Sequence, residues 1–239
     1  MKKYIITFCS LLLIISNTNA QVKTLQDYFQ HVDKFLSANV KAGKVNYKNI
    51  STNKSDLDAI ISYIGTKQKF VSSSEEKAFY LNAYNVLVIK GIVSNYPTKG
   101  PMEITGFFDK KQYAINGLNL SLNNIENDIV RKKFSDARIH FALVCGAKSC
   151  PPIQSYAFKP EKLDAQLELV TKQSIQNVLF TKIDLKNKKA SVSMLFNWYK
   201  DDFIKAKGSV LGFINNYLKT ALPANTTIEN YTYDWALNG

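Results

Sequence analysis

Residues 79–89 are apolar around almost the whole circumference of a helix, and this run constrains the fold more than any other segment. A helix of this kind is buried in a core rather than lying on a surface. Asn82 and Asn85 interrupt the run three residues apart, on one face. A buried amide left unpaired costs about 1–3 kcal/mol, so both side chains need partners. The partner is either the backbone of a neighbouring irregular segment, which is the commoner case, or a ligand.

The sequence just before this run indicates where its helix begins. Three serines at 72–74 precede Glu75 and Glu76, so hydroxyl caps come before acids in the first turn. These signals predict a helix over about 75–96 that ends before Pro97. The spacing of apolar residues predicts further helices over 21–39, 57–64, 162–177, 195–206 and 209–222, and Ser121 is placed to cap a helix that runs to Phe134.

Short strands complete the pattern. Asn116 and Gly117 separate residues 111–115 from 118–120, and this dipeptide favours the type I′ turn of a hairpin. A second hairpin is predicted for 179–185 and 189–192, and the apolar residues 138–144 have the length of a buried strand. Without repeats or linkers, the pattern predicts one α+β domain over 21–239, in which several helices pack on a small mixed or antiparallel sheet.

The first twenty residues contain the three parts of a secretory signal peptide. Lys2 and Lys3 are followed by an apolar run over 4–15 and by the small residues Thr18 and Ala20. We expect cleavage after Ala20, which leaves a periplasmic or secreted chain of 219 residues. The run is shorter than the ~20 residues that span a bilayer. We therefore expect no stable membrane insertion after cleavage, with an uncleaved anchor as the alternative.

The chain is basic, with a formal net charge of +12 that falls to +10 when Lys2 and Lys3 are removed. A basic balance can indicate nucleic acid or another anionic partner. The lysines are scattered, however, and no long basic arm or nucleic-acid motif is present. A solvated lysine-rich surface is the better interpretation, and we predict no nucleic-acid partner.

Cys145 and Cys150 are the two cysteines that remain after cleavage, and they lie in a loop with Gly146 and two prolines. An oxidising compartment favours a disulfide between them, although so short a loop gains only roughly 2 kcal/mol of chain entropy. Cys145 also follows the predicted strand, where a thiol at the mouth of a sheet would be reactive. A buried, inert thiol is the third alternative.

A thiol nucleophile needs a base, and the mature chain offers only His31 and His140. On one continuous strand, His140 and Cys145 would point to opposite faces roughly 16 Å apart. A Cys145–His140 pair therefore requires the chain to turn at or before Cys145. Ligand spacing for zinc and glycine loops for phosphates or dinucleotides are absent from the sequence, so we predict no metal and no cofactor. Asp201 and Asp202 are interpreted as a solvated or capping pair.

Several of these segments resemble the domain of unknown function 547 family. The resemblance spans about 43–239 and is carried by residues 77–85, 121–126, 138–151, 196–203 and 233–238. Plant members are similar around Cys145 but tend to have serine where Cys150 stands, which favours an individual role for Cys145. The chain departs from the family pattern at Asn127 and Asp128, where relatives often have His-Gly, and at Ala137, where proline is common.

These observations lead to two hypotheses for an uncharacterised exported protein. In the first, it is a thiol-dependent hydrolase or transferase in which Cys145 is the nucleophile, His140 the base, and Asn82 or Asn85 orients a group or stabilises an oxyanion. In the second, it is a non-catalytic module that binds a ligand or partner through a loop clipped by a Cys145–Cys150 disulfide. In either case the partner is a small molecule or peptide, and the residues predicted to contact it are Tyr84, Glu126, Arg138 and Ser149.

Overall fold

The computed structural model describes residues 22–239. The predicted signal peptide at residues 1–20 lies outside the described residues. Within them, no helix is both long enough and apolar enough to cross a membrane.

The described chain alternates helices with short strands. The α-helices are α1 (Leu25–Asn39), α2 (Tyr47–Thr52), α3 (Ser55–Gly65), α4 (Ser73–Val93), α5 (Leu122–Asn124), α6 (Lys132–Phe134), α7 (Leu163–Gln176), α8 (Leu195–Trp198), α9 (Lys200–Lys207) and α10 (Val210–Asn215). A π-helical segment, η2 (Ile125–Arg131), joins α5 to α6, and the 3₁₀ helices are η1 (Pro101–Glu103), η3 (Ala137–Phe141) and η4 (Pro160–Lys162). The strands are β1 (Val40–Lys41), β2 (Lys44–Val45), β3 (Tyr113–Ile115), β4 (Leu118–Leu120), β5 (Thr181–Asp184), β6 (Lys189–Val192) and β7 (Thr227–Asn230).

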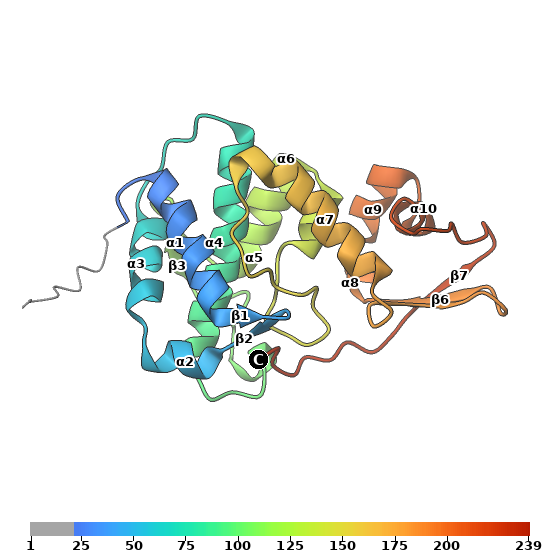
Figure 1. Ribbon diagram of the computed structural model, residues 1–239, viewed down its shortest axis with the longest axis horizontal. Coiled ribbons are helices and arrows are strands. Elements are labelled where there is room, and N and C mark those ends of the chain that lie inside the picture. Colours follow the sequence, from blue (N-terminus) through green and yellow to red (C-terminus); the bar gives the residue numbers. More distant parts are fainter. Residues whose placement is uncertain (1–21) are drawn as a thin grey trace, which may run out of the picture.

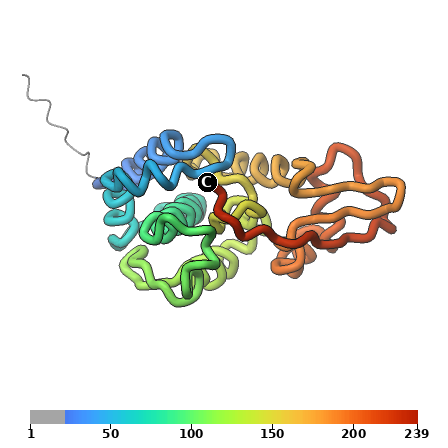
Figure 2. Tube along the Cα trace, turned by 90° about the horizontal axis from the view of Figure 1, so that it is seen from below, coloured from blue at the N-terminus to red at the C-terminus, as the bar shows by residue number. Residues whose placement is uncertain are grey.

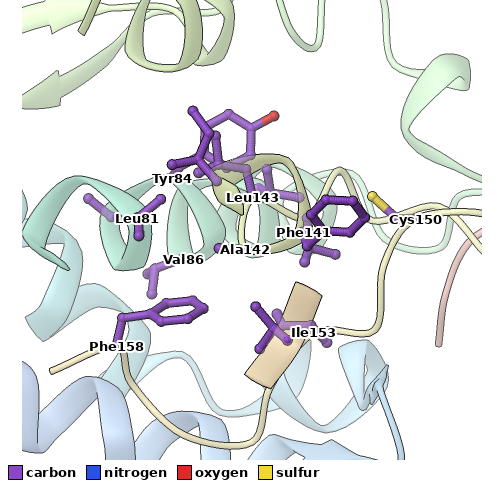
Figure 3. Close-up of a cluster of buried hydrophobic side chains, with 14 of the residues drawn as sticks. Leu81, Tyr84, Val86, Phe141, Ala142, Leu143, Cys150, Ile153 and Phe158 are labelled. Carbon is purple, nitrogen blue, oxygen red and sulfur yellow. The ribbon is translucent and has the colours of Figure 1, made fainter. Parts of the chain in front are cut away.

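Helix α4 is the centre of the larger, helical part of the molecule (Figure 1), where it packs against α1, α2, α3 and η2. Ser72 caps it by accepting a hydrogen bond from the backbone N–H of Glu75, as the serine run predicts. Nearly all residues from Ala78 to Val93 are buried, which confirms that an all-round apolar helix lies in the core. Figure 3 shows Tyr84 and Leu143 on one side of this helix and Phe158 and Ile153 on the other.

The strands form three small sheets. β1 pairs with β2, and β3 pairs with β4 across Asn116 and Gly117, whose positive φ values fit the predicted type I′ turn. β5 and β6 form the second predicted hairpin, and β7 adds to β6 in parallel. The combination of helices with small antiparallel and mixed sheets confirms the α+β class.

The β5–β6–β7 sheet, with α9 and α10, lies at one end of an elongated molecule (Figure 2). A cluster of aromatic rings connects this end to the helical part: Phe141 of η3 packs against Phe180, Phe196, Phe203 and Phe213. After β7 the chain runs back to the helical part, where it ends (Figure 2). This return places residues 233–238 beside the loop that contains the two cysteines.

Two predicted elements are wrong. Residues 138–144 do not form a strand, because η3 covers Ala137–Phe141 and the Asp136 carboxylate caps it by accepting from the N–H of Arg138. The helix predicted over 195–206 is divided into α8 and α9 at Tyr199, whose φ of −114° and ψ of 27° are not helical. Both departures turn side chains towards one pocket.

Candidate active site

One pocket, with a volume of about 220 Å³, lies where α4, η2, η3 and α8 meet the cysteine loop and the C-terminal segment. It contains a thiol, a carboxylate, an imidazole and several aromatic rings. Its lining residues are Tyr84, Phe108, Asn123, Glu126, His140, Leu143, Cys145, Cys150, Leu195, Trp198, Tyr199, Tyr233 and Trp235. Tyr84, Glu126, His140 and Cys145, all predicted from sequence, therefore share one cavity.

The cysteine loop is shaped by Gly146. Its φ of +83° lies in the region that favours glycine, and a Cβ there would lie 2.5 Å from Ile92 Cδ1. Backbone hydrogen bonds then join the loop to the C-terminal segment: Lys148 N–H donates to Ala236 O, and Asn238 N–H donates to Gly146 O. The loop is thus fixed on both sides, by the core and by the end of the chain.

The sulfur atoms of Cys145 and Cys150 lie 2.7 Å apart, and both are free thiols in the structure. The Tyr233 hydroxyl is 3.3 Å from Cys145 Sγ. Burial raises the pKa of Cys145, but hydrogen bonds from Cys150, Tyr233 and the Ala147 N–H outweigh it and hold that pKa below its ordinary value. Burial and the neighbouring Cys145 sulfur raise the pKa of Cys150. The pair therefore favours a thiolate on Cys145 and a proton on Cys150.

The disulfide of the second hypothesis is absent from this structure, in which neither cysteine is bonded to the other. The backbone N–H of Cys145 donates to Cys150 Sγ at 2.9 Å. Cys150 also borders a second cavity, of about 560 Å³, on the side of the β1–β2 hairpin.

Asn82 and Asn85 each clamp a loop to α4. The Asn85 amide donates to Ala142 O at 2.8 Å and accepts from Val144 N–H at 2.9 Å. Asn82 forms the same pair of bonds with the N–H and carbonyl of Phe158. These are the backbone contacts of the commoner alternative, and neither side chain lines the pocket. Asn85 instead fixes the residue immediately before Cys145.

His140 belongs to a polar chain that ends on η2. Its Nε2 is 2.8 Å from Asp202 Oδ2, which also accepts from Arg131 Nε at 2.8 Å. The hydrogen bond from His140, followed by that from Arg131, holds the pKa of Asp202 well below its usual range. An ionised carboxylate can only accept, so Nε2 is the donor in this contact. Among the described residues, His140 Nδ1 has no hydrogen-bond partner.

Glu126 is the carboxylate of the pocket. It lies on the π-helical segment η2, a rare element that frequently marks functional sites. The Tyr84 hydroxyl donates to Oε2 at 3.1 Å, and the Tyr199 hydroxyl donates to Oε1 at 2.5 Å. The Tyr199 ring also stacks on His140 with the ring centroids 3.8 Å apart. Tyr199 thus connects the carboxylate to the imidazole.

The structure places the other two predicted contact residues away from this pocket. Arg138 forms ion pairs with Asp136 and Asp164 at the surface. Ser149 binds the C-terminal segment, because its hydroxyl accepts from Asp234 N–H at 2.8 Å. Both have structural contacts, and neither lines the cavity that contains Cys145.

The sequence hypotheses give no role to several residues in or beside the pocket, among them Trp198, Tyr199, Asp202, Tyr233 and Trp235. The interpretation of Asp202 as a solvated or capping residue is wrong, because it binds His140 and Arg131. The available signal was the presence of these residues in the 196–203 and 233–238 segments of the family resemblance. Within residues 22–239, no group of three or more His, Cys, Asp or Glu side chains is arranged to hold a metal ion.

Comparison with known proteins supports the resemblance. Residues 68–175 match the family described as "Protein of unknown function, DUF547". This match assigns residues 68–175 to the DUF547 family. The match is shorter than the predicted 43–239, but it includes Tyr84, Glu126, His140, Cys145 and Cys150. No curated protein and no solved structure matches the chain significantly.

The DUF547 match thus covers the thiol, imidazole and carboxylate, whereas Asp202 and the aromatic residues at 198, 199, 233 and 235 come after it in the chain. The chemistry-bearing groups of the pocket lie within the family segment. Most of the aromatic residues that line the pocket come from the C-terminal part of the chain.

Proposed function

We propose that this DUF547 protein is a thiol-dependent hydrolase or transferase with Cys145 as its nucleophile. The observation that carries the proposal is the position of Cys145 Sγ on a pocket wall, 2.7 Å from Cys150 Sγ and 3.3 Å from the Tyr233 hydroxyl. Hydrogen-bond donors around a sulfur favour the thiolate, which is the nucleophilic form. A buried inert thiol would need no such set of donors.

His140 is the proposed proton carrier, with Asp202 in the orienting role first assigned to an asparagine. The Asp202 carboxylate fixes the ring by accepting from Nε2 at 2.8 Å, which leaves Nδ1 to take a proton. No hydrogen bond joins His140 to Cys145 among the described residues. In enzymes without substrate such contacts are often long and shorten when substrate binds.

The reaction is acyl transfer in two steps. The proton of Cys145 passes to His140 Nδ1, and the resulting thiolate attacks a carbonyl carbon and forms an S–C bond; the bond to the leaving group breaks, and that group takes the proton from His140. Water, or an acceptor nucleophile in a transferase, then gives a proton to His140 and attacks the thioester. The S–C bond breaks, and the sulfur recovers its proton. Water gives hydrolysis, and another acceptor gives transfer.

Acylation by p-nitrophenyl acetate tests this proposal. We expect nitrophenol release with an initial burst and an acetyl group on Cys145 by mass spectrometry. Cys145→Ala should abolish both, and His140→Ala should slow the burst about 100-fold or more. Acetylation of Cys145 no faster than that of a free thiol in the unfolded protein would reject the proposal.

A matched pair of variants separates orientation from surface charge. Asp202→Asn removes the ionised partner of His140, whereas Asp201→Asn makes the same change at the exposed neighbouring position. We expect the first to slow the burst about tenfold or more and the second to leave it unchanged. Equal rates for the two variants would remove His140 and Asp202 from the mechanism.

The alternative is a non-catalytic binding module with an oxidised loop. The two sulfurs lie 2.7 Å apart, so little movement is needed to form a disulfide. This short distance favours the binding module. A thiol count on protein isolated under non-reducing conditions discriminates between the two. Two free thiols, one alkylated unusually fast at neutral pH, support the enzyme; no free thiol, with ligand binding retained, supports the module.

We further propose that the protein is exported and that its domain begins at Gln21. The support is the basic start, apolar run and small residues within 1–20. Expression in a bacterial host followed by fractionation and N-terminal sequencing provides the test. Recovery outside the cytoplasm with Gln21 as the first residue is expected. An uncleaved cytoplasmic chain would reject export.

A further inference from the structure

The charge of the pocket contrasts with the charge of the chain. The protein has 31 Lys and Arg residues against 19 Asp and Glu, yet no Lys or Arg is among the described residues that line the pocket. Glu126 supplies the carboxylate, and His140 is the one basic group on the wall. The nearby Arg131 guanidinium is paired with Asp202 and Asn127 and does not line the cavity. The pocket therefore disfavours anions despite the basic surface.

The Glu126 carboxylate retains capacity to bind a ligand. It is only 9% exposed, and each of its oxygens accepts one hydrogen bond from a tyrosine. An ionised carboxylate has about four lone-pair sites, so roughly two remain. A charge buried in this way gains from a counter-charge, because water does little to screen it. A ligand with an N–H donor and a positive charge meets both needs.

Aromatic rings form the wall that extends from the mouth of the pocket. The rings of Trp198, Tyr233 and Trp235 have centroids 4.7–5.8 Å apart, and Phe108 lies beside Trp235. Trp198 remains 41% exposed, so part of this wall is open to solvent. The faces of such rings carry negative potential and attract cations, with tryptophan the strongest.

We propose that the pocket binds a substrate through an ammonium group, held between the Glu126 carboxylate and the aromatic wall of Trp198, Tyr233 and Trp235. This inference rests on the proposed function, since it names the substrate class of the Cys145 site. The cationic group belongs to the acyl donor or, in a transferase, to the acceptor. Because the ammonium group binds beside Cys145, it positions the bond that breaks or forms next to the Cys145 sulfur.

The chain provides its own reporter for this binding. Its two tryptophans are Trp198 and Trp235, and both line the pocket. We expect tert-butylammonium, which has N–H donors as well as a positive charge, to change tryptophan emission with an apparent affinity about tenfold or more above that of the neutral tert-butanol. Pivalate, an anion of similar shape, should bind more weakly than either. Equal responses to the three probes would overturn the proposal.

Cys145 offers a second measurement, through methanethiosulfonate reagents of different charge. The rate with the aminoethyl reagent, whose ammonium group has N–H donors, divided by the rate with the neutral methyl reagent, should exceed the same ratio for the unfolded protein. Glu126→Gln should lower this ratio about tenfold, whereas Glu161→Gln, the same change at an exposed position, should leave it unchanged. Use of a ratio removes any effect of Glu126 on the thiol itself.

The two proposals fail separately. Cys145→Ala should retain tert-butylammonium binding while it loses acylation, because the cation does not need the sulfur. Acylation without charge preference would reject the ammonium site and leave the nucleophile in place. Charge-selective binding without any acyl-enzyme would retain the cation site and reject catalysis.

Discussion

The hydroxyl of Tyr233 lies 3.3 Å from the sulfur of Cys145, a contact between residues 88 positions apart in the chain. It connects the C-terminal segment directly to the proposed nucleophile. Burial raises the pKa of Cys145, but hydrogen bonds hold it below its ordinary value. The Cys150 thiol lowers this pKa most, and the Tyr233 hydroxyl comes second. The reactivity of the thiol is thus set partly by a residue far from it in the sequence.

Tyr233→Phe should therefore move the pH profile of Cys145 alkylation. Loss of the donor raises the thiol pKa, so the inflection in iodoacetamide rate shifts to higher pH. The rate falls at neutral pH and is unchanged where both proteins are fully ionised. Tyr156→Phe is the control, because its hydroxyl has no hydrogen-bond partner among residues 22–239. Superimposable profiles for the wild type and Tyr233→Phe would show that the hydroxyl does not act on the sulfur.

Gly146→Ala and Gly208→Ala form a matched pair for the shape of the cysteine loop. Both glycines have positive φ, +83° and +75°, but a Cβ meets Ile92 only at Gly146. Gly208→Ala should cost about 1 kcal/mol of unfolding free energy from backbone strain, and Gly146→Ala about 2–4 kcal/mol. Urea unfolding measures both. Equal losses would mean that the loop moves away from α4 at little cost.

Asn85→Ala should destabilise the fold by about 2–4 kcal/mol. It leaves the carbonyl of Ala142 and the N–H of Val144 without their partner in a buried site. Asn225→Ala, at an exposed position, should change stability by less than about 0.5 kcal/mol. Denaturant unfolding monitored by circular dichroism provides the comparison. A loss near zero would indicate that water or rearrangement satisfies the loop.

Asp136 should contribute to the loss of stability in acid. Burial raises its pKa, but bonds and charges from Arg138 and Lys77 outweigh burial and bring the pKa to about 2. A lowered carboxyl pKa contributes stability above the unfolded value of about 3.9, and that stability is lost as pH falls towards 2. Asp136→Asn should cost about 2 kcal/mol at pH 7 and much less at pH 2.

The control for that experiment is Asp164→Asn. Asp164 also binds Arg138, but its side chain is 89% exposed. Exposed ion pairs contribute little, so we expect less than about 0.5 kcal/mol. If the loss at Asp136 were independent of pH, its cause would be packing rather than ionisation.

Local sequence signals predicted much of the fold. The Ser72 and Ser121 caps and the Asn116–Gly117 turn depend on neighbours within a few residues, and all three are present. The apolar run of α4 likewise predicted its own burial. Each of these features depends only on residues within one short segment.

The strand predicted at 138–144 failed for a reason that local sequence does not show. An extended segment needs bonding partners, and here the Asn85 amide supplies them to Ala142 and Val144 in place of a neighbouring strand. The sequence identified the asparagine and the apolar run separately. It did not show that each was the partner of the other.

The candidate site was predicted in part. Cys145, His140, Tyr84 and Glu126 share one cavity, whereas the break at Tyr199 and the return of Tyr233 and Trp235 depend on contacts across the chain. Residue pattern within a window carries no information on such contacts. The aromatic wall and the orienting Asp202 could therefore be found only from the folded structure.

Backbone hydrogen bonds join the cysteine loop to residues 234–238, and this has a consequence for biosynthesis. While the chain is still being made, the helical part can fold around α4, but neither the aromatic wall nor the hydroxyl beside the sulfur yet exists. A chain that stops before Tyr233 would lack this hydroxyl, so the pKa of its Cys145 should be higher. The site is completed only when residues 233–238 dock, so the chemistry we propose requires synthesis to have passed these residues.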